Sequence, residues 1–67
     1  MPNILLNGEP CTLRAGITLI NLLEGAGFAG RKVAVEINRE IVPKSLHGER
    51  VLNDGDRVEV VHAMGGG

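Results

Sequence analysis

Sixty-seven residues suffice for one small domain, and a chain of this length buries only about 60% of the surface that its unfolded form exposes, so a deep enzymatic cleft is not expected. Seven Lys and Arg against eight Asp and Glu give a net charge of -1, and the two signs are interspersed along the chain. With no basic stripe and Phe28 as the only aromatic residue, we expect neither nucleic acid nor a membrane surface as a partner.

Cys11 is the only cysteine, so the chain cannot form an internal disulfide, which small secreted domains usually need. Its apolar runs are short, and the N-terminus lacks the charged segment and following apolar segment of a secretory signal. We therefore expect a cytoplasmic protein without a membrane span.

Asn7-Gly8 is the strongest turn signal, because both central positions of a type I′ turn favour positive φ. It predicts a hairpin of two strands over 3–6 and 9–13. Strand alternation places one set of side chains on the buried face and a second set on the other. The buried set is Ile4, Leu6, Cys11 and Leu13, and the other set is Leu5, Pro10, Thr12 and Arg14.

A helix is predicted next, with Thr18 as its N-cap. Its apolar side chains recur at the spacing of one helical face, and they are Leu19, Leu22, Leu23 and Ala26. Gly27 can end the helix in the left-handed conformation, which lets Phe28 fold back onto Leu23.

The rest of the chain consists of short segments. Alternation predicts a strand over 33–37, a turn at 38–39, and an edge strand over 41–42 that Pro43 ends. An irregular segment over 44–50, a brief strand over 51–52 and a turn over 53–56 precede a last strand with Val58 and Val60. This order predicts an α+β domain, a ubiquitin-like β-grasp. In it, one main helix covers a mixed sheet of four to five strands, and the first and last strands are central and parallel.

No catalytic or metal-binding set emerges from the motifs. The glycines at 25, 27 and 30 spell G-x-G-x-x-G, but they follow a helix instead of opening one, so a nucleotide site is not expected. Cys11, His47 and His62 are the available soft metal ligands, and no two of them have a chelating spacing. Cys11 is expected to face the core, which disfavours a nucleophilic role.

A glycine tail closes the chain, and it admits two interpretations. Gly65, Gly66 and Gly67 have no side chains to pack, so the tail is either a frayed terminus or a segment that another protein threads through a slot too narrow for a Cβ atom. In the second case the carboxylate of Gly67 is the reactive group. We expect a folded domain over 1–63 and a flexible tail over 64–67.

Apolar residues on the sheet face away from the helix also admit two interpretations. Leu5, Ala34, Val61, Ala63 and Met64 are either scattered surface residues or, where they form one patch beside the tail, a docking site for a partner.

With these elements placed, the chain resembles the ThiS family, the ubiquitin-like sulfur carriers of thiamin biosynthesis, over essentially its whole length. The matching stretches are TLINLL at 18–23, INREIVP at 37–43, LNDGD at 52–56 and the terminal glycines. Two departures are His47, where many relatives have tryptophan, and Gly65, a third glycine before the usual pair.

The resemblance implies a protein co-substrate instead of an enzyme. An adenylating enzyme related to ubiquitin activators would convert the carboxylate of Gly67 to an acyl-adenylate, with ATP and magnesium bound on that partner and no cofactor held stably by this chain. A persulfide from a cysteine desulfurase or another donor would then give a thiocarboxylate, from which thiazole synthase takes the sulfur. The alternatives are a carrier for molybdopterin or cysteine synthesis and a ubiquitin-fold binding module with an incidental tail.

Overall fold

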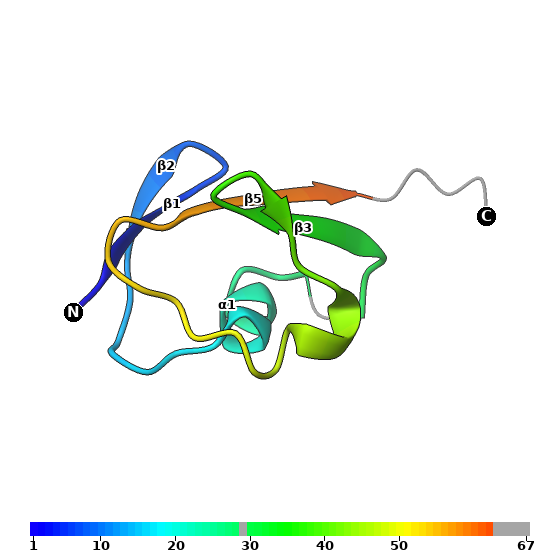
Figure 1. Cartoon of the computed structure of the whole chain (residues 1–67), viewed down its shortest axis with the longest axis horizontal. Coiled ribbons are helices and arrows are strands. Elements are labelled where there is room, and N and C mark those ends of the chain that lie inside the picture. The colour runs from blue at the N-terminus through cyan, green and yellow to red at the C-terminus, as the bar shows by residue number, and fades with distance from the viewer. Residues whose placement is uncertain (29, 63–67) are drawn as a thin grey trace.

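A computed structural model describes residues 1–28 and 30–62 of the chain. Within them, strands β1 (Asn3–Leu6), β2 (Glu9–Thr12), β3 (Val33–Ile37), β4 (Glu40–Ile41) and β5 (Arg57–His62) form one mixed sheet in the order β2-β1-β5-β3-β4. Helix α1 (Leu19–Gly25) and the 3-10 turn η1 (Lys44–Leu46) lie on the same side of this sheet (Figure 1). Because β1 and β5 are adjacent and parallel, the predicted ubiquitin-like β-grasp is confirmed.

The β1–β2 hairpin forms as its turn sequence predicts. Asn7 and Gly8 have φ angles of 50° and 83°, the positive values that a type I′ turn requires. Ile4 faces Cys11 across the hairpin. Ile4 is buried, and Cys11 is partly buried and packs against the core. Pro10 lies on the edge strand, where a residue without an N–H is tolerated.

Helix α1 begins at the predicted N-cap, and Gly27 forms the predicted left-handed stop after it. Thr18 is the N-cap, and it forms a capping box with Asn21, in which each side chain accepts a hydrogen bond from the other residue's backbone N–H. At the other end Gly27 has φ 88°, and the backbone N–H of Phe28 donates to the carbonyl of Leu23 at 2.8 Å. This is the hydrogen bond of a Schellman cap, and Phe28 packs against the core.

Ala26 does not lie on the buried face of α1, so that prediction is wrong. The helix ends at Gly25, and Ala26 is its exposed C-cap. The helical spacing that would carry Ala26 onto the stripe is interrupted there by the turn into Gly27.

The core lies between α1 and the helix-facing side of the sheet. Leu19 and Val58 are fully inaccessible to solvent. The remaining buried apolar residues come from the hairpin and the residue after it, the helix, strands β3 and β5 and the loop before β5: Ile4, Leu13, Leu22, Leu23, Val35, Ile37, Leu52 and Val60.

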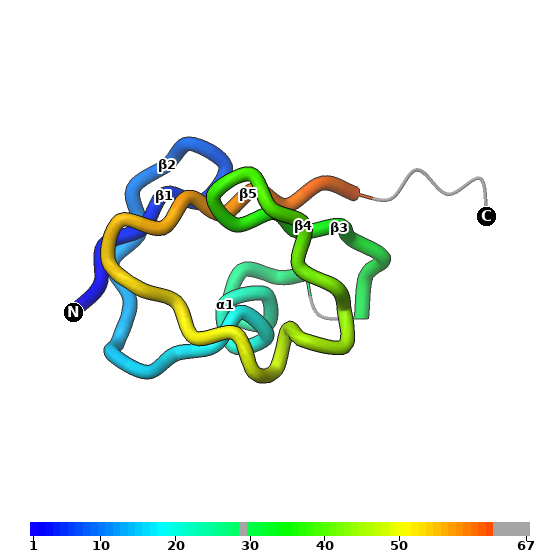
Figure 2. Tube along the Cα trace, viewed as in Figure 1, coloured from blue at the N-terminus to red at the C-terminus, as the bar shows by residue number. Residues whose placement is uncertain are grey.

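The segment between β4 and β5 runs along α1 before it returns to the sheet (Figure 2). Backbone N–H groups of Leu19 and Ile20 donate to the carbonyls of Arg50 and His47 at 2.8 and 2.9 Å, so this segment satisfies donors that the first turn of a helix leaves free. The brief strand predicted over 51–52 is instead an isolated bridge from Val51 to Thr18. Two smaller differences are the start of β4 at Glu40 and the turn η1 inside a segment predicted to be irregular.

His47 occupies a buried position in this segment, with 4% of its surface exposed. Its Nε2 lies 3.0 Å from the carbonyl oxygen of Val42, so the ring nitrogen carries the proton and donates it. The ring therefore fills its site as a satisfied polar residue of the core.

Asp56 is also buried and polar, and it joins three parts of the chain. Its Oδ1 accepts a hydrogen bond from the Asn38 side-chain amide at 3.0 Å, and its Oδ2 accepts one from the backbone N–H of Asn53 at 2.8 Å. The guanidinium of Arg50 lies 3.7 Å from Oδ2. Asn38 in turn accepts from the backbone N–H of Arg57, so the start of β5 is tied to the β3–β4 turn.

Leu22→Ala should lower the free energy of unfolding by about 2–5 kcal/mol, because it leaves a cavity under the sheet in a small core. Ile20→Ala on the same helix is the matched control, since its side chain is 36% exposed, and it should cost less than about 1 kcal/mol. Urea unfolding followed by circular dichroism measures both, and equal losses would contradict the packing of α1.

Asp56→Asn should lower the free energy of unfolding by about 1–3 kcal/mol, because an amide cannot accept from both Asn38 and Asn53 and so leaves two donors facing each other. Asp54→Asn is the control. The Oδ1 of Asp54 accepts one hydrogen bond, from the backbone N–H of Asn3, and an amide oxygen can replace it. Thermal melting that ranks the two variants equally would refute the role assigned to Asp56.

Candidate functional site

The strand that precedes the glycine tail is held on both sides. β5 pairs with β1 in parallel and with β3 in antiparallel orientation, from Ile37 opposite Val58 to Val33 opposite His62. The ring of His62 lies 5.8 Å from the ring of Phe28, centroid to centroid. β1 pairs with β5 only at Arg57 and Val58, so the last described residues of the strand are held by β3 and by the contact between His62 and Phe28.

The tail residues themselves are outside the described part of the chain. Gly65, Gly66 and Gly67, with Ala63 and Met64, belong to residues 63–67, and the roles predicted for them stay predictions.

The structure places the three described docking candidates on the sheet face opposite α1. Ala34 and Val61 are directly opposite each other on β3 and β5, and 60% of Val61 is exposed. Leu5 is half-buried and lies opposite Arg57, four residues before Val61 on β5. Glu59 lies between these positions on the same face, so Leu5 is separated from the pair by charged side chains.

Two carboxylates on this face were not identified from the sequence. Glu36 and Glu59 are directly opposite each other across β3 and β5, and Ile41 is the partner of Glu36 on the next strand. Alternation alone places Glu36 and Glu59 on the outer side of their strands, but only the pairing register reveals that they are neighbours. Over the ranges 1–28 and 30–62, the ion pair formed is Arg50 with Asp56, and neither glutamate takes part in one.

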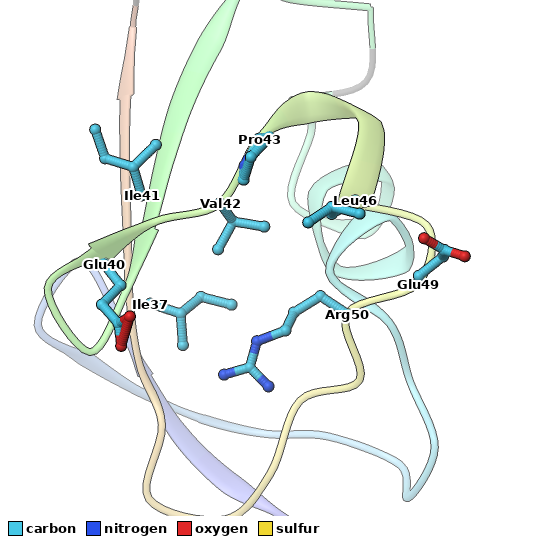
Figure 3. Close-up of a pocket in the computed structure, with 8 residues that line it drawn as sticks. All are labelled: Ile37, Glu40, Ile41, Val42, Pro43, Leu46, Glu49 and Arg50. Atoms are coloured by element: carbon cyan, nitrogen blue, oxygen red, sulfur yellow. The ribbon is translucent and has the colours of Figure 1, made fainter.

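A groove of about 440 Å³ opens beside β4 (Figure 3). Ile37, Val42 and Leu46 form its apolar wall, and the side chain of Arg50 extends across it. That guanidinium is already occupied, because it donates to the carbonyl of Val51 at 3.0 Å and lies beside Asp56. Glu40 and Glu49 also line the groove, and the described residues around it include no thiol or hydroxyl group.

The soft ligands lie apart in the fold. Cys11 is half-buried on β2, His47 is buried after η1, and His62 ends β5. In the described ranges no three His, Cys, Asp or Glu residues gather closely enough to hold a metal ion. The described helices also include none long and apolar enough to cross a membrane.

Comparison with known proteins gives the family. A sequence profile of the ThiS family matches residues 4–67. The chain is 47% identical over 62 residues to the sulfur carrier protein ThiS of Thermus thermophilus, and the match covers 92% of this chain and 95% of that protein. The crystal structure of the thiamine biosynthesis protein ThiS from Geobacter metallireducens superposes with a TM-score of 0.83 at 32% identity, covering 97% of this chain and 99% of that one.

A longer relative also matches. The chain is 53% identical over 62 residues to a thiazole synthase of Magnetococcus marinus, which covers 92% of this chain but only 19% of the relative. The chain therefore spans about a fifth of the length of that protein.

Glu59→Gln should raise the free energy of unfolding by about 0.2–1 kcal/mol, because like charges directly opposite each other on neighbouring strands destabilise a sheet. The gain should shrink in 1 M NaCl, where the Debye length is about 3 Å. Glu9→Gln is the control, since Glu9 lies opposite Leu6 and relieves no repulsion. Urea unfolding at low and high salt measures the difference, and a destabilised Glu59→Gln protein would contradict it.

Proposed function

Because the chain belongs to the ThiS family, we propose that it is a sulfur carrier of thiamin biosynthesis whose Gly67 carboxylate is the group that is activated and loaded. The observation that carries the proposal is the family match, which runs through the terminal glycines to residue 67. The fold supports it, because the paired strand β5 delivers the tail from a fixed point on the domain.

Chemistry explains why the terminus needs a partner enzyme. A carboxylate is a poor electrophile because its leaving group would be oxide, so ATP must first convert it to an acyl-adenylate with release of pyrophosphate. The terminal sulfur of a persulfide then attacks the acyl carbon and AMP leaves. A thiol reduces the resulting acyl disulfide, which breaks the S–S bond and leaves the thiocarboxylate on Gly67.

The ATP site in this proposal belongs to an adenylating enzyme of the ubiquitin-activator type. A phosphate cradle needs a glycine-rich loop that opens a helix, whereas Gly25 and Gly27 of this chain close α1. Magnesium would accompany ATP on the partner. The protein itself acts as a co-substrate, and no described side chain is assigned a catalytic role.

A thiocarboxylate is ionised at neutral pH and nucleophilic, so a thiazole-forming enzyme can take its sulfur. The match within a protein named thiazole synthase supports thiazole synthase as that recipient. A cysteine desulfurase or another persulfide donor would supply the sulfur.

Deleting Gly67, or replacing Gly66 by valine, should abolish formation of the acyl-adenylate, because the first removes the reacting residue and the second adds a Cβ atom to a tail that must pass a narrow channel. The assay incubates the protein with the adenylating enzyme, ATP and magnesium, and intact-mass spectrometry detects AMP attached to the chain. The intact mass of the untreated protein is measured first, because it shows whether Gly67 is its C-terminal residue.

Gly48→Val is the matched control for this experiment. Gly48 has no positive φ, and a Cβ atom there would meet open space, so this variant should be adenylated like the parent. Normal adenylation of the Gly66→Val protein or of the truncated protein would refute the proposal. Adenylation and sulfur loading without transfer to thiazole synthase would instead assign the carrier to another pathway.

A further inference from the structure

We propose that the outer face of the sheet docks on a basic, partly apolar surface of the adenylating enzyme, with an arginine or lysine of that enzyme bound between the carboxylates of Glu36 and Glu59. We call the residues concerned the acidic face, and they are Ala34, Glu36, Ile41, Glu59 and Val61. The inference rests on the proposed function, because it names how the partner that activates Gly67 recognises the folded domain.

The pairing register brings these residues together. Ile41, Glu36 and Glu59 form one row across β4, β3 and β5, and Ala34 with Val61 forms the next row toward the end of β5. Neighbouring strands are about 4.8 Å apart and rows on one face are about 7 Å apart, so the five side chains make one continuous surface.

The surface is apolar at its margins and exposed. Ile41 and Val61 expose 71% and 60% of their surface, which is high for large aliphatic residues. Both α1 and η1 lie on the opposite side of the sheet, so neither of them covers this face (Figure 1). Large aliphatic side chains exposed together on one face are typical of a protein interaction site.

Charge identifies the kind of partner. Two carboxylates directly opposite each other repel, and within the described ranges neither is ion-paired. Arg57 is the nearest cation on the same strand, and it lies opposite Leu5, on the side of Glu59 away from Val61. A guanidinium or ammonium group of a partner would offset the repulsion between Glu36 and Glu59 and would donate charge-assisted hydrogen bonds to both carboxylates.

Position connects this face with the tail. Val61 is six residues from Gly67, and an extended chain of six residues spans at most about 20 Å. Glu59 is eight residues from Gly67, so an enzyme that binds a cation between Glu36 and Glu59 must have its adenylation centre within about 29 Å of that contact.

The test measures the apparent KM and kcat of the adenylating enzyme for this carrier, by pyrophosphate exchange. Glu36→Gln with Glu59→Gln should raise KM about tenfold with kcat nearly unchanged and should weaken the salt dependence of KM, because binding loses its central charges while the tail stays intact. Glu36→Lys with Glu59→Lys should raise KM about a hundredfold. Glu9→Gln removes one negative charge outside the acidic face and should leave KM within twofold.

Structural damage does not explain such a loss, because the glutamine variants are expected to unfold no more easily than the parent, and the melting curve checks this directly. An unchanged KM in both double variants, or an equal rise with Glu9→Gln, would overturn the inference while the carrier function stands. If the parent binds the enzyme through these glutamates but never accepts AMP, the docking stands and the proposed function fails.

Two other binding partners of the acidic face would each be revealed by a separate measurement. A dimer of the carrier that is seen by sedimentation and lost in the glutamine double variant would assign the face to a second copy of the chain. Calorimetric binding of magnesium alone that depends on both glutamates would assign it to a cation. Either result overturns the assignment to the adenylating enzyme.

Discussion

The buried carboxylate of Asp56 is the constraint on which the geometry of the sheet depends. It receives hydrogen bonds from the Asn38 side chain and the Asn53 backbone, and it lies beside Arg50. These donors come from the β3–β4 turn, the turn before β5 and the loop along α1, so a single group fixes three segments that are distant in sequence. A buried carboxylate needs such partners, because burial removes its hydrogen bonds to water and the protein must supply others in their place.

That constraint decides which side chains of β5 face the core. A slip of one residue would turn every side chain of the strand to the other face. With Asp56 fixed and Asn38 bonded to the backbone of Arg57, Val58 and Val60 face the helix, and Glu59 and Val61 face outward. The side chain of Asn7 adds a second fixed point, because it accepts from the backbone N–H of Val60 at 2.8 Å where β1 has ended. β5 thus contributes side chains both to the core and to the acidic face.

The sequence was sufficient where a structure depends on local chemistry. Asn7-Gly8, the Thr18 cap and the Gly27 stop each act within a few residues, and each lies where it was predicted. The opposition of Glu36 and Glu59 depends instead on the pairing register of residues 23 positions apart, which alternation within each strand cannot supply. The same holds for Asp56, whose turn was predicted but whose partners at Asn38 and Arg50 were not. The prediction for Ala26 failed for a different reason, since the helical spacing was extended one residue beyond Gly25, where α1 ends.

A glycine tail carries no side-chain information, so a partner must distinguish this carrier from other proteins with similar tails by its folded surface. The net charge of -1 gives little long-range attraction toward any partner, which leaves recognition to local groups. The groove beside β4 is a poor candidate because Arg50 is already paired there. The acidic face includes Glu59 and Val61 of the strand that precedes the tail, and neither of its two carboxylates is ion-paired within the described residues. In the proposed complex β5 serves both recognition and delivery, since binding that fixes Glu59 and Val61 also fixes the strand end that precedes the tail.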